Sequence, residues 1–334
     1  MDWAIAARAM QVSGQTETAL KLALKVWNES AGDPEAALIA SEVLSADVPA
    51  WHFNLLRDQA RNAAYDAALR RLVRPGMRVL DIGSGTGLLA MMAARAGAAQ
   101  VFSCEMNPAV AEAAKEIVAA NGFSDRIKIL GKHSGELDAD ADLGGRVDLI
   151  VSELVSNNMV AEGVLTSMPP AVENLLKPGC PVVPAGGTVR IALAFDPNLS
   201  RKRVGTDEGF DLRAFNRLAK PIYQMTNTKT ELQLMSDSVD LFDFDFCVTA
   251  AVAEERAQRV LIARGGPVNC IAQWIYLEMD DEGRFENMPG GPDYSNWAVL
   301  VRPLATPADM QAGDAVTVNG WHDLFHVRIW VVTE

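Results

Sequence analysis

Three glycines at alternate positions follow a short apolar segment near residue 80, and this pattern constrains the fold more than any other in the chain. The segment "VLDIGSGTG" passes through Asp81 and continues with Gly83, Gly85 and Gly87. Glycine allows a sharp turn from a strand into a helix and lets the backbone approach a ligand closely. We therefore expect a strand, a ligand-binding turn and a helix in this order.

Apolar segments and helical segments alternate along residues 46–175. The predicted strands are residues 77–83, 100–105, 127–132 and 147–153, and the predicted helices between them include residues 88–97 and 107–122. A β-α-β-α order is typical of a parallel sheet covered by helices on both faces, with ligands at the carboxyl ends of the strands. Residues 46–175 are thus expected to form an α/β Rossmann-like domain.

The flanking regions show other patterns. Residues 1–45 have apolar residues at helical spacing and predict a short N-terminal helical segment, a pair of helices similar to one tetratricopeptide-type unit. Over residues 176–334 strand-like alternation takes over, and an all-β barrel domain is expected. Its expected strands include residues 239–248, 270–280, 297–304 and 325–333. The charged, irregular segment 196–231 is expected to project from this domain as an arm.

The charge of the chain limits its partners. The sequence has 30 basic and 43 acidic residues, which gives a formal net charge of −13. This balance argues against a nucleic-acid binder, which needs a basic face. A negative net charge favours a cationic partner; alternatively, it serves only to keep the enzyme soluble.

The cysteines and the hydropathy pattern indicate a cytoplasmic protein. The four cysteines are scattered and form no C-x-x-C pair, so neither a zinc site nor a disulfide framework is expected. The N-terminus lacks the features of a signal peptide, and no segment approaches the roughly 18 uninterrupted apolar residues of a membrane span. We therefore expect no bound metal and no membrane association.

The glycine loop resembles the S-adenosylmethionine loop of Rossmann-like methyltransferases. A dinucleotide site would favour G-x-G-x-x-G, whereas this chain has G-x-G-x-G preceded by Asp81. Glu105 ends the next strand, where an acid can hydrogen-bond both hydroxyls of a ribose. His133 and Ser134, after the third strand, are candidates for contacting the adenine edge, although a histidine there can equally be an ordinary loop residue. S-adenosylmethionine is the cofactor that this resemblance implies.

Two glutamates lie nine positions apart after the fourth expected strand. The segment "SELVSNNMVAE" begins this pair with Glu153 and ends it with Glu162. This spacing resembles the double-glutamate loop of the protein arginine methyltransferases, which implies a guanidinium as the substrate group. A guanidinium is planar, stays protonated at neutral pH and offers five N–H donors. Two carboxylates can grip it, hold its positive charge on the far nitrogens and align one nitrogen for attack on a methyl group. The pair is thus a candidate catalytic clamp; the alternative is a helix-start acid and an unrelated surface acid.

Over most of its length, from about residue 50, the sequence resembles the protein arginine methyltransferases. "SELVSNNMVAE" is similar to the double-glutamate loop of that family, and "LLRDQARNAAY" is similar to the helix that precedes its sheet. The resemblance implies that Arg61 binds the carboxylate of the cofactor and that Asp58 contacts the substrate guanidinium or the first glutamate. "YSNWAV" resembles the family's threonine–histidine–tryptophan loop, which implies that Asn296 and Trp297 bind substrate.

The chain also departs from the family pattern. "LSADVPAWHF" has no tyrosine where the family has a Tyr-Phe-x-x-Tyr segment folding over the cofactor, so Trp51, His52 or Phe53 would have to close the site. Asn296 replaces the family's barrel-loop histidine and cannot match its basicity. The residues between the glutamates look closer to the family branch with two tandem modules. Because this chain has one module, the resemblance implies a homodimer through the barrel-domain arm, with "GFDLRAFN" as its anchor.

Three functions remain open at this point. The first is an S-adenosylmethionine-dependent arginine N-methyltransferase that acts on an arginine-containing protein or peptide. The second is a methyltransferase for a small-molecule amine or guanidine, and the third is a cofactor-binding scaffold with weak or no catalysis. Room beside the attacking nitrogen decides between mono- and dimethylation, and Leu55, Met159 and Asn296 are candidates for shaping it.

Overall fold

The computed structural model describes residues 2–29, 32–46, 48–228 and 230–332. The chain divides into two compact units that interleave along the sequence. The first unit consists of Met1–Arg57, Leu69–Ser152 and Asn174–Cys180, and the second of Asp58–Ala68, Glu153–Glu173 and Pro181–Glu334. The domain boundaries expected at residues 45 and 175 stay predictions.

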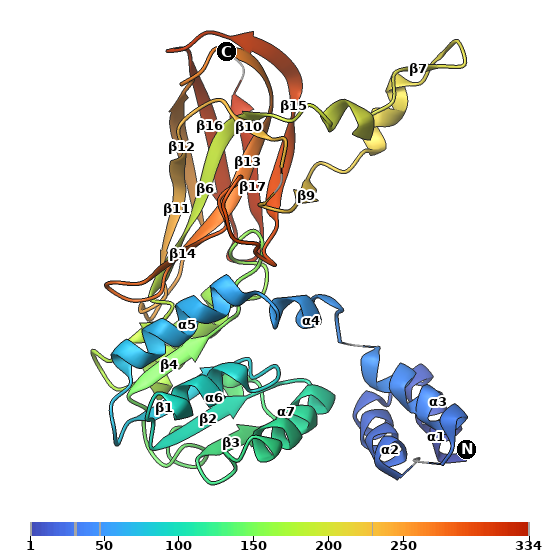
Figure 1. The fold of residues 1–334 in the computed structure, drawn as a ribbon, viewed down its shortest axis with the longest axis vertical. Coiled ribbons are helices and arrows are strands. Elements are labelled where there is room, and N and C mark those ends of the chain that lie inside the picture. The colour runs from blue at the N-terminus through green and yellow to red at the C-terminus, as the bar shows by residue number, and fades with distance from the viewer. Residues whose placement is uncertain (1, 30–31, 47, 229, 333–334) are drawn as a thin grey trace. The chain divides into compact units, whose positions relative to one another are not determined.

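A parallel sheet with flanking helices forms the centre of the first unit (Figure 1). β1 (Arg78–Ile82) pairs with β2 (Gln100–Cys104) on one side and with β4 (Leu149–Ser152) on the other, and β2 pairs with β3 (Ile127–Leu130). α6 (Leu88–Arg95) follows β1, and α7 (Pro108–Ala120) follows β2. This order confirms the predicted Rossmann-like class.

Local sequence explains these elements. β4 is buried along its whole length, as expected for a continuous apolar strand covered on both faces. α7 begins at Pro108, whose missing N–H costs nothing at the first helical position. Asn107 caps this helix because its Oδ1 accepts the N–H groups of Ala109 and Val110 at 3.0 and 3.3 Å.

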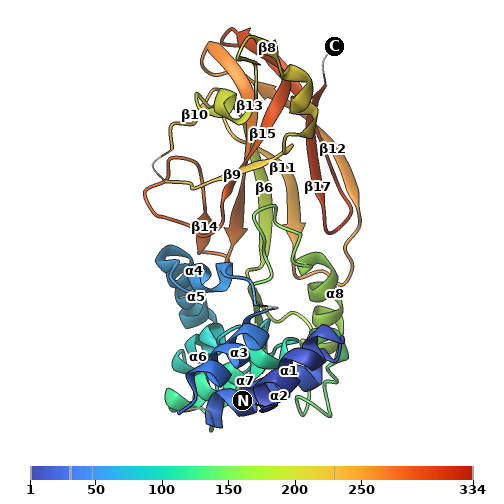
Figure 2. The same cartoon turned by 90° about the vertical axis from the view of Figure 1, so that its right-hand side faces the viewer.

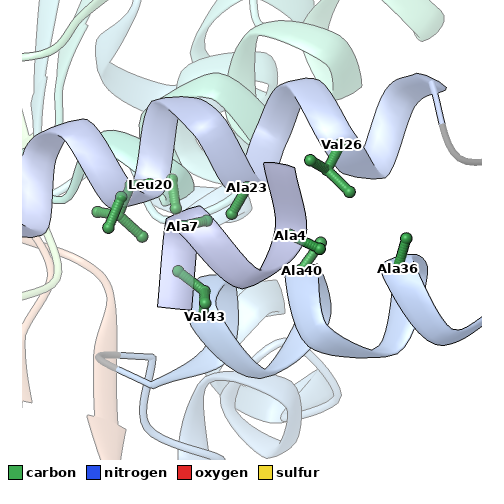
Figure 3. Packing of buried hydrophobic residues seen from close by; sticks show 10 residues of the cluster. Ala4, Ala7, Leu20, Ala23, Val26, Ala36, Ala40 and Val43 are labelled. Atoms are coloured by element: carbon green, nitrogen blue, oxygen red, sulfur yellow. The ribbon is translucent and has the colours of Figure 1, made fainter. Parts of the chain in front are cut away.

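The first three helices of the described residues pack on one another. They are α1 (Asp2–Val12), α2 (Thr16–Glu29) and α3 (Pro34–Ser45), and Figure 3 shows the small side chains at their contacts. Ala4, Ala7, Ala23 and Ala40 are fully buried, and Ala109 of α7 belongs to the same cluster. The sequence predicted a pair of helices; α1 is a third, which buries only two alanines and therefore has a weak apolar period. α4 (Trp51–Leu55) and α5 (Gln59–Leu72) come next.

Two antiparallel sheets form the barrel-like part of the second unit, and their strands are drawn in Figure 2; a separate two-stranded sheet lies within residues 206–211. In the larger sheet, β6 (Gly186–Phe195) pairs with β10 (Gln233–Leu234), β11 (Val239–Asp245) and β13 (Gly266–Glu278). β13 also pairs with β14 (Arg284–Glu286) and β15 (Val299–Met310). β15 in turn pairs with β9 (Tyr223–Met225). The smaller sheet has the order β12 (Glu254–Leu261), β16 (Ala315–His322) and β17 (Val327–Val332). These sheets confirm the predicted barrel-like class; Thr333, the end of the last expected strand, lies outside the described residues.

Burial alternates from Phe242, in the second half of β11, to Phe246, which follows the strand. Phe242 and Phe246 are buried, and Asp243 and Asp245 are exposed. Because successive side chains of a strand point to opposite faces, one face of this segment joins the core and the other meets solvent.

Among the described residues, three short strands and two 3-10 helices lie within the segment 196–231 that was predicted to be an arm. Four of these elements are η2 (Leu199–Lys202), β7 (Thr206–Asp207), β8 (Phe210–Asp211) and η3 (Arg213–Leu218). The fifth is β9, which pairs with β15 and so belongs to the larger sheet. In Figure 1 the end labelled β7 projects away from the barrel strands of the same unit. Within the described residues, no helix is both long and apolar enough to cross a bilayer.

Candidate active site

The glycine loop of the first unit joins the end of β1 to the start of α6. All three glycines have positive φ angles, 83° at Gly83, 51° at Gly85 and 76° at Gly87. The N–H groups of Gly83 and Ser84 donate to the carbonyl of Cys104, which fastens the loop to the end of β2. A side chain at Gly85 would meet nothing within 4 Å, so the backbone there is open to a ligand.

Asp81 is fully buried beneath this loop. Its Oδ2 accepts a hydrogen bond of 2.7 Å from the hydroxyl of Ser103, and this hydroxyl also hydrogen-bonds Ser84 Oγ. Asp81 therefore connects β1, β2 and the glycine loop. The sequence indicated the acid but not Ser84 and Ser103, because only the strand register brings Ser103 opposite Asp81.

Glu105 directly follows β2, and the loop orients its carboxylate. Oε2 accepts the N–H of Gly85 at 3.1 Å, and Oε1 accepts the N–H of Asn107 at 2.9 Å. Each carboxylate oxygen can accept more than one hydrogen bond, so a pair of ribose hydroxyls fits the chemistry of this group. The residues present thus suit the adenosine part of S-adenosylmethionine.

His133 and Ser134 lie at the start of η1 (Ser134–Glu136). His133 Nδ1 accepts the N–H of Gly135 at 3.1 Å, and Glu136 accepts the N–H of His133 at 3.4 Å. This is a capping arrangement in which His133 is exposed and Ser134 is buried. The proposed contact of both residues with an adenine edge stays a prediction.

Arg61 and Glu153 form a buried ion pair in the second unit. The distance from Arg61 Nη2 to Glu153 Oε2 is 3.1 Å, and their side chains are only 5% and 6% exposed. The guanidinium of Arg61 also lies 5.5 Å from the centre of the Tyr65 ring. The sequence placed Arg61 and Glu153 in separate roles, and the fold brings the two side chains into contact.

Asp58 lies immediately before α5 and is fully buried. Its Oδ1 accepts the N–H of Arg61 at 3.0 Å, which caps the helix that carries this arginine. Its Oδ2 accepts the N–H of Asn296 at 2.7 Å. Asp58 therefore links the start of α5 to the "YSNWAV" loop, and its predicted contact with a guanidinium is not tested by this geometry.

Hydrogen bonds within the segment between the two glutamates hold it in a compact turn. Asn158 Oδ1 accepts the hydroxyl of Ser156 at 2.6 Å and the N–H groups of Val160 and Ala161 at 3.2 and 3.0 Å. Met159 has a φ of 80° and is fully buried. Sequence reasoning singled out Met159 but missed Ser156 and Asn158, whose importance depends on the conformation of the turn.

The "YSNWAV" loop of the barrel-like domain donates two hydrogen bonds to the segment between the glutamates. Trp297 Nε1 donates to the carbonyl of Val155 at 2.7 Å, and the N–H of Ala298 donates to Asn157 Oδ1 at 2.8 Å. Trp297 is buried and packs edge-on against Phe285. The predicted residue Trp297 therefore holds the glutamate loop, a role that nothing in the sequence distinguished from substrate binding.

Of the residues expected to shape the substrate pocket, Met159 and Asn296 belong to the second unit and Leu55 to the first. Leu55 is buried at the end of α4. Trp51 and His52, two candidates for closing the site, stack on each other with ring centres 3.9 Å apart. Their closing role and that of Phe53 stay predictions.

The electrostatics of the glutamate pair are unusual. Burial raises the pKa of Glu153 to about 8, helped by the charges of Glu162 and Asp58 and opposed by Arg61 and the N–H of Val155. Desolvation also raises the pKa of Glu162, against the effect of Arg61. Glu162 is solvent-exposed, so water weakens its shift and we expect the larger one at Glu153.

The two carboxylate oxygens of Glu153 differ in their hydrogen bonding. Glu153 Oε2 contacts Arg61, whereas the buried Oε1 has no hydrogen-bond partner among the described residues. Buried polar atoms are almost always paired in proteins. This buried carboxylate oxygen can therefore still accept a hydrogen bond.

Comparisons with known proteins agree with this chemistry. A family model described as ribosomal protein L11 methyltransferase (PrmA) matches residues 67–187. The arginine N(omega)-methyltransferase of Streptomyces achromogenes subsp. streptozoticus is 38% identical over 292 residues, which cover 86% of this chain and 80% of that protein. Protein arginine N-methyltransferase 7 of Drosophila grimshawi is 33% identical over 258 residues, 69% of this chain but 36% of that longer protein.

A solved structure shares the fold. The Trypanosoma brucei PRMT1 enzyme–prozyme heterotetrameric complex with AdoHcy has a TM-score of 0.72 and 26% identity, covering 83% of this chain and 88% of that one. Fold, glycine loop and matches define a Rossmann-like methyltransferase with an appended barrel-like domain. More particularly, the chain belongs to the arginine N-methyltransferase family and is an S-adenosylmethionine-dependent enzyme.

Proposed function

We propose that the enzyme transfers a methyl group to a guanidinium nitrogen of an arginine held between Glu153 and Glu162. The unpaired, buried Oε1 of Glu153 is the observation that carries this proposal. Burying a carboxylate oxygen without a donor is costly, and a guanidinium supplies both the donor and the compensating charge.

Each glutamate has a distinct part in the proposed reaction. Glu153 is buried and fixed by Arg61, so it orients the guanidinium and holds its positive charge away from the attacking nitrogen. S-adenosylmethionine supplies the methyl group on a positively charged sulfur. A guanidinium nitrogen that accepts the methyl group would have to release a proton. We assign this proton to Glu162, whose exposed carboxyl has a raised pKa and can pass the proton to solvent.

The residues proposed to hold the cofactor are those that the sequence indicated. Gly83, Gly85 and Gly87 offer an open backbone, and Glu105 offers an oriented carboxylate for the ribose hydroxyls. Arg61 remains the proposed partner of the cofactor carboxylate, since a guanidinium with five N–H donors can serve Glu153 and a second carboxylate.

An arginine in a protein or peptide is the proposed substrate. The net charge of −13 favours association with arginine-rich segments. The Drosophila relative is named a protein arginine methyltransferase, which supports the same choice.

Free arginine or another small guanidine is the second candidate substrate. The Streptomyces relative is named an arginine N(omega)-methyltransferase without reference to protein, and this chain covers 80% of it. The clamp recognises only the guanidinium, so its chemistry is the same for both candidates.

One assay separates these functions. The purified enzyme is incubated with isotope-labelled S-adenosylmethionine and either arginine-rich peptides or free L-arginine, and methyl-arginine is read by mass spectrometry. Label in peptides that disappears in Glu153→Gln and Glu162→Gln but persists in Glu173→Gln, an exposed glutamate of α8 (Val164–Leu175), supports the proposal. Label in free arginine alone supports the second candidate. Cofactor binding without any transfer would overturn both in favour of a scaffold.

We also propose a homodimer formed through the arm. Large apolar side chains of the arm are exposed, among them Phe210, Leu212, Phe215 and Leu218. Apolar side chains gathered on one projecting segment are typical of an interaction surface. The cytoplasmic location stays a prediction.

A further inference from the structure

We propose that Asn158 is a positioning residue that fixes Glu153 and Glu162 relative to each other. The inference rests on the proposed function, because it concerns the geometry of the two carboxylates. Asn158 itself is assigned no contact with substrate or cofactor; it acts through the backbone of the turn between the glutamates.

The oxygen of the Asn158 side chain joins the two halves of this turn. From the half that follows Glu153, it accepts the Ser156 hydroxyl at 2.6 Å. From the half that leads to Glu162, it accepts the N–H groups of Val160 and Ala161 at 3.2 and 3.0 Å. Three donors therefore converge on one amide oxygen.

Ser156 strengthens the same connection. Its hydroxyl oxygen accepts the N–H of Ala161 at 2.9 Å, and its carbonyl accepts the N–H of Met159 at 2.8 Å. Ala161 is the residue immediately before Glu162, and its single N–H is shared between the side-chain oxygens of Ser156 and Asn158.

The backbone conformation and the packing of Met159 also restrict the turn. Met159 adopts a φ of 80°, a conformation that L residues rarely take, and its side chain is fully buried. A Cβ placed on Gly187 of β6 would lie 2.7 Å from Met159 Cε, which shows how closely this side chain packs on the barrel. Met159 anchors the middle of the turn, and Asn158 then sets where its two ends lie.

A neutral acceptor suits this position. An aspartate would present similar oxygen atoms, but it would add a negative charge to the turn that joins Glu153 and Glu162. That charge would disfavour ionisation of both glutamates. An asparagine oxygen accepts the same three hydrogen bonds without this effect.

The consequence for catalysis is large because methyl transfer requires close alignment. A displacement of about 1 Å in a reacting group can cost about a hundredfold in rate. Asn158→Leu keeps the size of the side chain and removes the acceptor. We expect it to lower kcat by about ten- to a hundredfold, with little change in the affinity for S-adenosylmethionine.

The test compares four variants of the full chain, assayed with free L-arginine and a glycine-flanked arginine peptide. Asn158→Leu removes the acceptor, and Asn158→Asp restores it. Asn121→Leu is the matched control, because it deletes an asparagine hydrogen bond at the end of α7, in the first unit. Glu153→Gln reports on the proposed function itself.

The inference predicts a loss of kcat in Asn158→Leu and recovery to within about threefold of wild type in Asn158→Asp at pH 9, where the glutamates are ionised. It is overturned if Asn158→Leu keeps wild-type kcat while Glu153→Gln is inactive, or if Asn158→Asp is as impaired as the leucine variant. An active Glu153→Gln would instead refute the proposed function. Should Asn158→Leu fail to fold, Ser156→Ala serves in its place, because it removes one donor to Asn158. The inference then requires that Ser156→Ala lowers kcat, by less than the roughly ten- to a hundredfold expected for Asn158→Leu.

Discussion

Glu153 has a carboxyl group that is hard to ionise before substrate binds. It is buried beside one guanidinium, that of Arg61, and faces the negative charges of Glu162 and Asp58. Its ionised form is therefore favoured by any ligand that brings a second guanidinium. Substrate binding and ionisation of Glu153 should thus be coupled.

This coupling predicts the pH dependence of the enzyme. The pKa of Glu153 is raised to about 8, so at lower pH the free enzyme holds this carboxyl protonated and grips a cation weakly. We expect kcat/KM to rise about tenfold per pH unit below pH 7 and to level off above about pH 8. The arginine substrate stays protonated throughout and does not contribute.

Initial rates with subsaturating arginine peptide between pH 6 and pH 9.5 measure this profile. A control with saturating substrate separates kcat from kcat/KM. A kcat/KM that is constant over this range, or that falls with pH, would contradict the assignment of the raised pKa to the substrate clamp.

Charged residues of the candidate site could be identified from the sequence, whereas the residues that position them by hydrogen bonds could not. Glu153 and Glu162 could be found from their spacing after an apolar strand, since that spacing is local. Asn158 could not, because an asparagine is common in any turn and its role depends on three donors converging in space. The contact of Asn296 with Asp58 joins residues 238 positions apart and runs through a backbone N–H, which carries no sequence signal.

At the scale of elements, the "YSNWAV" loop and the glutamate loop support each other. Two hydrogen bonds connect them, from the Trp297 indole to the Val155 carbonyl and from the Ala298 N–H to Asn157. Both bonds lie in buried or partly buried surroundings, where leaving a partner unpaired is expensive. The "YSNWAV" loop, which leads into β15, thereby fixes the position of the first half of the glutamate loop.

We predict that Trp297→Phe loosens this connection. The phenyl ring keeps most of the packing against Phe285 but leaves the Val155 carbonyl without its indole donor. The free energy of unfolding should fall by about 1–3 kcal/mol, and kcat should fall with it. Urea unfolding followed by circular dichroism measures the first effect.

Trp330→Phe is the matched control, because Trp330 is an exposed tryptophan on β17. It should change the free energy of unfolding by less than about 0.5 kcal/mol. Equal losses of stability in the two variants would show that the indole hydrogen bond of Trp297 has no special role.

Elements were predictable where one physical signal dominates. The strands of the parallel sheet are continuous apolar runs, and α7 has a cap and a proline at its start, so both were expected from the sequence. α1 was not separated from its neighbours, since its buried residues are only Ala4 and Ala7 and alanine gives a weak periodic signal. The pairing of β6 with both β11 and β13 depends on contacts distant in sequence and could not be predicted.

For the molecule as a whole, the arm and the net charge define the expected partners. The arm exposes Phe210 and Phe215, with exposed fractions of 70% and 66%. A chain with a net charge of −13 repels further copies of itself unless apolar contacts compensate. We therefore expect the dimer to depend on these aromatic side chains.

Replacing both phenylalanines by serine should weaken the dimer about a hundredfold. Light scattering coupled to gel filtration at micromolar concentration should then show a monomer in place of a dimer. Val12→Ser, at an exposed apolar residue of α1, serves as the control and should leave the dimer intact. A monomeric wild-type chain, or a dimer that survives the double substitution, would refute the proposed role of the arm.

The central claim is that Glu153 grips the guanidinium that receives the methyl group. The most direct test is the rate of labelled methyl-arginine formation by wild type and Glu153→Gln, measured by mass spectrometry at pH 9 with saturating S-adenosylmethionine. Glutamine has nearly the same shape without the charge, so the rate should fall by at least about a hundredfold, while cofactor affinity stays within about threefold. A Glu153→Gln enzyme that forms methyl-arginine at the wild-type rate would contradict the account.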